Sequence, residues 1–252
     1  MKKSFYETKG FAVAVLLFGV FGLLLVGHHI ASYEAILRPY MDFLIENRVI
    51  TNDVNGMNFL YFFTYQSNIF VDLFLVLYAI GILGNKKMYD LTHNEKLRGA
   101  VTLYIFITGI IYCGVLLPFA TASFPMEKGI WFSNVNNVWS HLIVPLVFTI
   151  FWFFPVNEKK IPVTKTALTF LIYPIAYLIF SLIRGAYTDF YPYPFLNSEQ
   201  LWSVLLADKP FESGPAMALL IAVIIALTGF FFGVGSALCA IHNKIVEKRI
   251  KE

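Results

Sequence analysis

Long apolar runs alternate with short polar stretches along most of the chain. Six of these runs are long enough to cross the roughly 30 Å hydrocarbon core of a bilayer as helices. They cover about residues 10–29, 59–83, 99–119, 137–154, 166–184 and 215–241. The first run has a basic start but is long and has no clear small-residue cleavage site, so we expect a retained helix. The pattern predicts an all-α, polytopic membrane protein with a single integral membrane domain over residues 1–252.

The composition and the placement of charge agree with this pattern. The chain of 252 residues is 58% hydrophobic and 14% charged, with a mean hydropathy of +0.68, unlike a typical soluble domain. Most of the 19 Lys and Arg residues fall at the two ends and in alternate connections: Lys2, Lys3, Lys9, Lys86, Lys87, Lys96, Arg98, Lys159, Lys160, Lys165, Lys244, Lys248, Arg249 and Lys251. The positive-inside rule then puts both termini in the cytoplasm. Because topology accounts for these charges, no nucleic-acid partner is expected.

Polar residues interrupt the second apolar run at helical spacing. At about 100° per residue, Thr64, Ser67, Asn68 and Asp72 share one face, whereas Gln66 points away from it. Unpaired polar groups are costly in hydrocarbon, so this face is predicted to look into the bundle or into a wet cavity. Either the residues join helices through hydrogen bonds, or they form a functional site. At about 1.5 Å per residue, the Asp72 carboxyl lies roughly 12 Å deeper than Thr64.

His141 is the one histidine that falls well inside an apolar run. The predicted topology places it about one turn into the fourth span, in the same outer slice of the membrane as Thr64. Pro145 removes the hydrogen bond that would reach the His141 carbonyl, which favours a kink, and Asn137 at i−4 could orient the ring. A hydroxyl beside an imidazole suits nucleophilic catalysis, but a buried histidine can equally be a hydrogen-bonding partner. The competing Ser236 lies roughly 30 Å below the outer end of its helix.

The aromatic residues, the cysteines and the histidines bear on further kinds of chemistry. The aromatic and proline run Tyr191–Phe195 (YPYPF) is either a structured cap on the outer side or a set of interfacial anchors. Cys113 and Cys239 both lie in apolar runs, which argues against a disulfide framework or a thiolate metal site. A haem would need paired axial histidines within the span, and His141 has no such partner there. We therefore expect no metal and no cofactor.

Three short motifs occur in order along the chain: FTYQSN opening the second span, Trp139-Ser140-His141 followed by Pro145, and Arg184-Gly185 followed by YPYPF. With the six apolar runs, the chain resembles the androgen-induced family of membrane hydrolases, and its FTYQSN wording resembles the bacterial branch. The resemblance implies cleavage of fatty acid esters of hydroxy fatty acids, with Thr64 as nucleophile and His141 as general base. It also implies a fatty acyl substrate within the bilayer and a bacterial cytoplasmic membrane.

Supporting roles follow from residue chemistry. Ser67 and Asn68 could donate hydrogen bonds to an oxyanion. Arg184 could pair with a fatty acid carboxylate or serve as an interfacial anchor. Besides the hydrolase, two hypotheses stay open: a transporter or lipid-binding protein in which Asp72 carries a proton or cation, and a structural subunit of a larger assembly. The sequence does not identify a protein partner.

Overall fold

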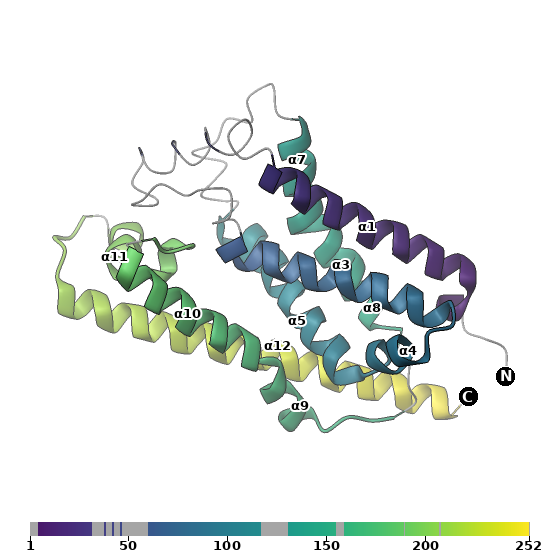
Figure 1. The fold of residues 1–252 in the computed structure, drawn as a ribbon. Helices are drawn as coiled ribbons and strands as arrows, with labels where there is room; N and C mark the ends of the chain where they lie inside the picture. The colour runs from purple at the N-terminus through teal and green to yellow at the C-terminus, as the bar shows by residue number, and fades with distance from the viewer. Residues whose placement is uncertain are drawn as a thin grey trace.

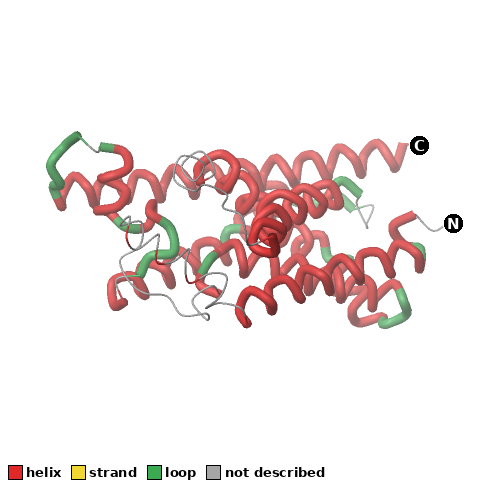
Figure 2. The backbone as a smooth tube through the Cα atoms, turned by 90° about the horizontal axis from the view of Figure 1, so that it is seen from above, coloured by secondary structure: helices red, strands yellow, loops and turns green. Residues whose placement is uncertain are grey.

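The computed structural model describes residues 5–31, 38, 42, 46, 60–116, 131–154, 159–188, 190–206 and 208–251. Within these residues the chain is helical and contains no strand. Six helices are long and apolar enough to cross a membrane: Lys9–Ala31, Phe63–Ile82, Glu95–Val115, Val135–Trp152, Val163–Thr188 and Ser213–Lys251. The predicted all-α fold with six apolar spans is confirmed. Figures 1 and 2 show both termini at the same end of the molecule.

The helices pack as a bundle around α5 (Glu95–Ile111). On one side, α1 (Lys9–Ala31) and α3 (Phe63–Ile82) run side by side (Figure 1). On the other side lies α12 (Ser213–Lys251), and α8 (Val144–Trp152) packs directly against α5. One apolar core cluster joins α3, α5 and α8, and a second joins α5 to α9, α10 and α12. The α5 helix contributes buried residues to both clusters, and Phe63 of α3 and Trp152 of α8 also reach the second one.

Local signals explain why some spans differ from the predicted ranges. The third span begins at Glu95 because the Asn94 side chain caps α5 by accepting from the amides of Lys96 and Leu97. It continues past α5 as the π-helix η4 (Tyr112–Leu116), and the predicted residues 117–119 and 59 lie outside the described part. The last helix runs well beyond the apolar run that ends near residue 241. Its charged end includes a Glu247–Lys251 ion pair of 3.0 Å at helical spacing.

The fourth span is irregular around Pro145. It consists of α7 (Trp131–Val138), a π-helical turn η5 (Trp139–Ile143) and α8. The amide of Val144 bonds to the carbonyl of Trp139, five residues earlier, and α8 has Pro145 in its first turn. Gly109 of α5 lies against this point, where an added Cβ would come within 2.8 Å of the Pro145 ring. At the place where a kink was predicted, the structure has a π-turn that contains His141.

The fifth span also has two parts, and short elements follow it on the side away from the termini. Helix α9 (Val163–Phe170) is followed by a turn at Leu171 and then by α10 (Ile172–Thr188). The chain then forms the 3-10 turn η6 (Pro194–Leu196) and α11 (Ser198–Leu205). Both η6 and α11 contact α12. The aromatic and proline run therefore packs onto the bundle.

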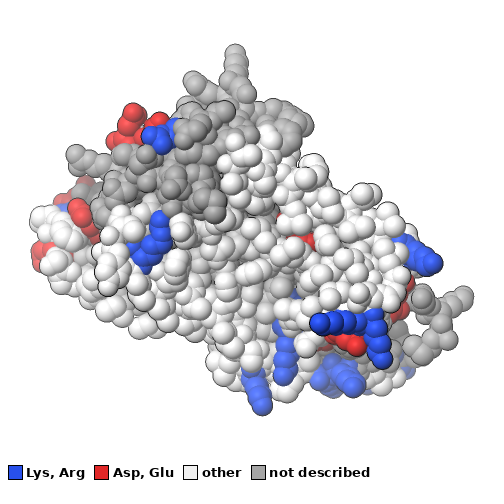
Figure 3. Space-filling model, in the orientation of Figure 1, with Lys and Arg blue, Asp and Glu red and all other residues white. Residues whose placement is uncertain are grey.

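The end of the molecule that carries the termini is basic (Figure 3), and a buried arginine joins two of its helices there. Short α4 (Lys86–Thr92) joins α3 to α5 here, and Figure 3 shows Lys and Arg side chains gathered at this end below a broad uncharged surface. Arg98 is fully buried and pairs with Glu95 at 3.1 Å. It also donates to the carbonyls of Phe151, Trp152 and Phe154, which satisfies acceptors at the end of α8.

Candidate active site

The start of α3 is held by two tyrosine hydroxyls from distant parts of the chain. Phe62 precedes the helix, and its apolar side chain cannot accept a hydrogen bond from the first amides. Instead, the amide of Phe63 donates to the Tyr177 hydroxyl at 3.1 Å, and the amide of Thr64 donates to the Tyr193 hydroxyl at 3.3 Å. The Tyr177 hydroxyl in turn donates to the carbonyl of Tyr61 at 2.8 Å. These bonds satisfy amides that a helix start leaves open, and they fix the position of Thr64.

The polar face of α3 is buried in the bundle. Ser67 donates to the carbonyl of Thr64 at 3.0 Å, and its oxygen lies 2.7 Å from the hydroxyl of Thr108 on α5. Asn68 donates to the carbonyls of Thr64 at 2.8 Å and Ser140 at 3.0 Å. Each of these side chains thus joins α3 to a neighbouring helix while also bonding within α3. Gln66 donates to the carbonyl of Leu60 and accepts from Tyr173, apart from the polar face.

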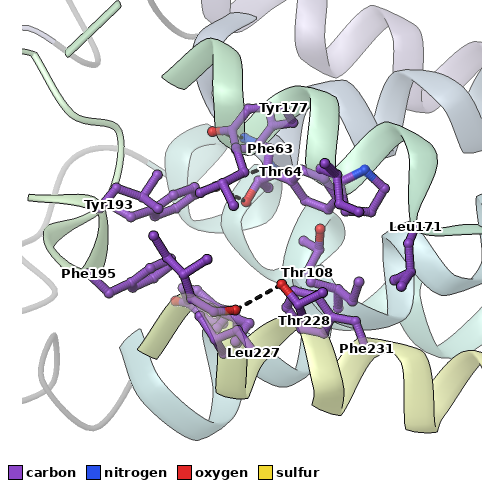
Figure 4. Close-up of a pocket in the computed structure, with 18 residues that line it drawn as sticks. Phe63, Thr64, Thr108, Leu171, Tyr177, Tyr193, Phe195, Leu227, Thr228 and Phe231 are labelled. Carbon is purple, nitrogen blue, oxygen red and sulfur yellow. Dashed lines mark hydrogen bonds between the residues drawn. The ribbon is translucent and has the colours of Figure 1, made fainter. Parts of the chain in front are cut away.

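Thr64 lies in the wall of a pocket between α3, α5, α10, η6 and α12 (Figure 4). The pocket has a volume of about 90 Å³, and nearly all of its lining is carbon. Its lining residues are Phe63, Thr64, Ile107, Thr108, Ile111, Tyr112, Leu171, Pro174, Ile175, Tyr177, Leu178, Tyr193, Phe195, Leu196, Ile224, Leu227, Thr228 and Phe231. Such a lining fits an apolar chain with a polar group placed near Thr64.

The ring of His141 is oriented by its own helix and by Tyr112. Its Nδ1 lies 3.0 Å from the carbonyl oxygen of Asn137. Because a carbonyl only accepts, Nδ1 carries the hydrogen and Nε2 keeps the lone pair that a general base needs. The imidazole stacks on the Tyr112 ring with 3.9 Å between centroids, and the Asn137 amide donates to the Tyr112 hydroxyl at 2.6 Å. Asn137 therefore positions both rings.

Thr64 and His141 approach the same pocket in different ways. Thr64 is a lining residue, whereas His141 contacts Tyr112, which lines the pocket, and is not itself part of the lining. Within the described residues, no hydrogen bond joins Thr64 to His141. The nearest side-chain partner of the Thr64 hydroxyl is the Tyr193 hydroxyl, at 3.5 Å. The structure thus brings Thr64 together with Ser67, Asn68 and Tyr193, and links His141 to Asn137 and Tyr112.

Asp72 lies away from the pocket, against α1. Its side chain is buried, and a Cβ added to Gly22 would overlap its carboxyl group. A Cβ on Gly19 would likewise come within 2.7 Å of the Asp72 carbonyl oxygen. Over the described part of the chain, Oδ1 of Asp72 has no hydrogen-bond partner. Two glycines of α1 therefore provide the space that this carboxyl occupies, and Asp72 belongs to the α1–α3 interface.

Arg184 sits at the end of α10 among aromatic rings. Its guanidinium carbon lies 3.8 Å from the centroid of the Tyr61 ring and 4.7 Å from that of Phe190. This arrangement is a cation–π contact, and it fastens α10 to the residues before α3. Arg184 is not a lining residue of the pocket. Its proposed pairing with a fatty acid carboxylate stays a prediction.

Several site residues were not found from the sequence. Tyr177 and Tyr112 reach the site only through the fold, and tyrosine is too common in this chain to give a signal. Tyr193 belongs to the YPYPF run noted in the sequence, but its contact with Thr64 could not be predicted from that motif. A second polar network also lies next to the α3 face: buried His29 contacts the Tyr65 hydroxyl at 2.9 Å and the Asn136 amide at 3.1 Å. Asn136 accepts from Ser140. In the described residues, no group of three His, Cys, Asp or Glu side chains is placed to hold a metal ion.

Six apolar spans and a largely carbon-lined pocket define this chain as a helical polytopic protein compatible with integral membrane placement. Comparison with family models gave no match, and no curated protein or solved structure matches the chain significantly.

Proposed function

We propose that this protein is an intramembrane lipid-ester hydrolase with Thr64 as nucleophile and His141 as general base. The observation that carries the proposal is the placement of Thr64 in the wall of a largely apolar pocket. Tyr112 lines the same pocket and stacks on His141, which keeps a lone pair on Nε2. An acyl chain would fill the pocket, and its ester would lie beside Thr64.

The reaction proceeds by acyl transfer. His141 takes the hydroxyl proton as the Thr64 oxygen bonds to the carbonyl carbon, and the carbonyl electron pair moves onto its oxygen. When the carbonyl re-forms, the bond to the alcohol oxygen breaks, and that oxygen receives the proton from His141. Water then attacks the acyl-threonine while His141 takes its proton. The bond to Thr64 breaks, His141 returns the proton to the threonine oxygen, and the fatty acid leaves.

His141 must come within hydrogen-bonding distance of the Thr64 hydroxyl for this step. Catalytic hydrogen bonds are often long or unformed before substrate binds, and they tighten in the complex. The Tyr112 ring is the group that would have to adjust, because it contacts His141 and borders the pocket. Filling the pocket with an acyl chain would act directly on this ring.

The membrane orientation proposed here places both termini in the cytoplasm of a bacterial cell. The basic end of the molecule supports this orientation through the positive-inside rule (Figure 3). The start of α3 belongs to the opposite end, so Thr64 would lie in the outer leaflet. A lipid substrate would then reach the pocket without leaving the membrane.

Covalent labelling tests the proposal directly. A long-chain alkyl fluorophosphonate should label the purified protein, and Thr64→Ala and His141→Ala should each abolish labelling while the melting temperature stays close to the parent value. Thr64→Ser keeps a hydroxyl and should retain labelling. Thr102→Ala is a matched control, because the Thr102 hydroxyl bonds to the carbonyl of Arg98 and does not line the pocket. Unchanged labelling of Thr64→Ala would refute the proposal.

A second candidate is a lipid-binding protein without hydrolytic activity. This candidate is favoured because, within the described residues, no hydrogen bond joins Thr64 to His141. In that case the parent protein would bind a fluorescent fatty acid but remain unlabelled by the phosphonate, and Thr64→Ala would bind it equally well. A proton- or cation-coupled path through Asp72 would be separate from this pocket, since Asp72 does not line it. Loss of coupled flux in Asp72→Asn would identify such a path.

A further inference from the structure

Acyl transfer requires a hydrogen-bond donor for the negative charge that develops on the carbonyl oxygen. Ser67 and Asn68 are the polar neighbours of Thr64 on the same helix face, but both are already engaged. The two amide hydrogens of Asn68 go to the carbonyls of Thr64 and Ser140. The Ser67 hydroxyl bonds to the Thr64 carbonyl and shares a hydrogen bond with Thr108. Neither side chain has a donor left for a substrate.

Tyr193 offers a donor in the right place. Its hydroxyl oxygen accepts from the Thr64 amide at 3.3 Å and lies 3.5 Å from the Thr64 hydroxyl oxygen. The Tyr177 hydroxyl is a further hydrogen-bonding neighbour of the phenol. Because the Thr64 hydroxyl donates to His141 during attack, the hydrogen of the Tyr193 phenol is the donor available to the substrate carbonyl oxygen. Tyr193 lines the pocket, so that hydrogen can point toward a bound ester (Figure 4).

The Tyr193 ring is held firmly by other residues of the same region. Phe195 stacks on it with 5.1 Å between centroids and an interplanar angle of 3°. Phe62 meets it edge-on at 5.8 Å. Burial also raises the pKa of the Tyr193 phenol, so the group keeps its hydrogen at neutral pH. A fixed, protonated donor needs no reorganisation when charge develops nearby.

We propose that Tyr193 is a further catalytic residue, whose hydroxyl hydrogen-bonds the substrate carbonyl oxygen as Thr64 attacks. The inference rests on the proposed hydrolase function. The carbonyl electron pair moves onto the oxygen, the Tyr193 hydrogen bonds to that oxygen without leaving the phenol, and the Thr64 proton goes to His141. When the carbonyl re-forms, the hydrogen bond weakens and Tyr193 is unchanged.

This role also explains the aromatic and proline run. The run docks on the bundle through Tyr193, so the same hydroxyl that satisfies the α3 amide also completes the reaction centre. Tyr191 has a different contact: its ring occupies the space beside Gly185, where a Cβ would overlap it, and it does not line the pocket. The two tyrosines of one motif therefore provide a matched pair for experiment.

The test compares Tyr193→Phe with Tyr191→Phe in hydrolysis of the p-nitrophenyl ester of a long-chain fatty acid. Tyr193→Phe should lower kcat by about 10²–10³-fold with little change in KM, the usual effect of losing one oxyanion donor. Tyr191→Phe should stay close to the parent enzyme. If Thr64→Ala is inactive but Tyr193→Phe has the parent kcat, or only a raised KM, the role of Tyr193 is wrong and the hydrolase stands. If Thr64→Ala is fully active, both proposals are overturned.

A second variant covers the case in which Tyr193→Phe does not fold. A fluorinated tyrosine introduced at position 193 keeps the hydroxyl and the shape of the ring but ionises at lower pH. Since an ionised phenol cannot donate, the alkaline limb of the kcat profile should shift to lower pH. The same substitution at Tyr191 should leave the profile where it was. An unchanged alkaline limb for the position 193 variant would overturn the proposal.

Discussion

The guanidinium of Arg98 donates to the main-chain carbonyl of Trp152 at 2.9 Å, which joins the start of α5 to the end of α8. Arg98 lies in the membrane-sized span Glu95–Val115 but is fully buried, and its charge is balanced by Glu95 at 3.1 Å. This buried arginine thus holds two helices together, in addition to any part it has in setting topology.

Replacing Arg98 with Met should destabilise the protein strongly. The substitution removes the guanidinium that pairs with the Glu95 carboxylate and donates to the carbonyls at the end of α8, and removing one member of a buried pair typically costs about 3–5 kcal/mol. Thermal unfolding in detergent, followed by loss of helical circular dichroism, would measure the effect. The double variant with Glu95→Gln should recover part of the loss. An Arg98→Met protein as stable as the parent would contradict this account.

Replacing Gly22 with Ala should weaken the α1–α3 interface. The new methyl group would overlap the carboxyl of Asp72, and overpacking of this kind typically costs about 1–3 kcal/mol. Gly27 lies on the same helix with nothing within 4 Å of an added Cβ, so Gly27→Ala is the control and should not lower the melting temperature. Equal melting temperatures for the two variants would show that the close approach is not tight.

Stability should depend on pH through His93, which lies between α4 and α5. Its ring stacks on Tyr89 at 3.6 Å and on Tyr78 at 5.4 Å, and burial lowers its pKa in the folded protein. Below about pH 6.5 the unfolded chain therefore binds this proton more readily, so stability should fall as the pH drops from there toward the folded pKa. Melting temperatures measured from pH 7 to pH 5 should decrease less for His93→Phe than for the parent. Parallel curves would exclude His93 as the source.

Filling the pocket should block lipid binding. Leu227→Trp places a large ring among the lining residues, so displacement of a fluorescent fatty acid should show at least a several-fold weaker affinity. Ile225 lies on the same helix but is 65% exposed and outside the lining, which makes Ile225→Trp the matched control. If both tryptophan variants bind the probe as the parent does, the acyl chain does not occupy this pocket.

The six spans could be predicted from the sequence because, in a bilayer, the backbone polar groups of each apolar run must form their hydrogen bonds within one helix. The predicted ends of the spans were less accurate. The Asn94 cap puts the start of α5 at Glu95, before the predicted start at residue 99, and α12 continues beyond its apolar run into a charged segment. The polar face of α3 was visible because helical periodicity links Thr64 to Asn68 locally. Tyr193 was not, because its bond to Thr64 spans 129 residues and depends on how the segment after α10 docks.

The π-turn at Trp139–Ile143 changes the direction in which the side chains before it point around the helix axis. A π-turn holds one more residue than an α-helical turn, so residues on its outer side are rotated by about 100° relative to an uninterrupted α-helix. Deleting one residue from the turn would restore a regular helix and rotate Asn136 and Asn137 away from His29 and Tyr112. The fourth span would still cross the bilayer, but its polar side chains would face the wrong neighbours. Chain length within this turn therefore decides which neighbours the polar side chains of the fourth span contact.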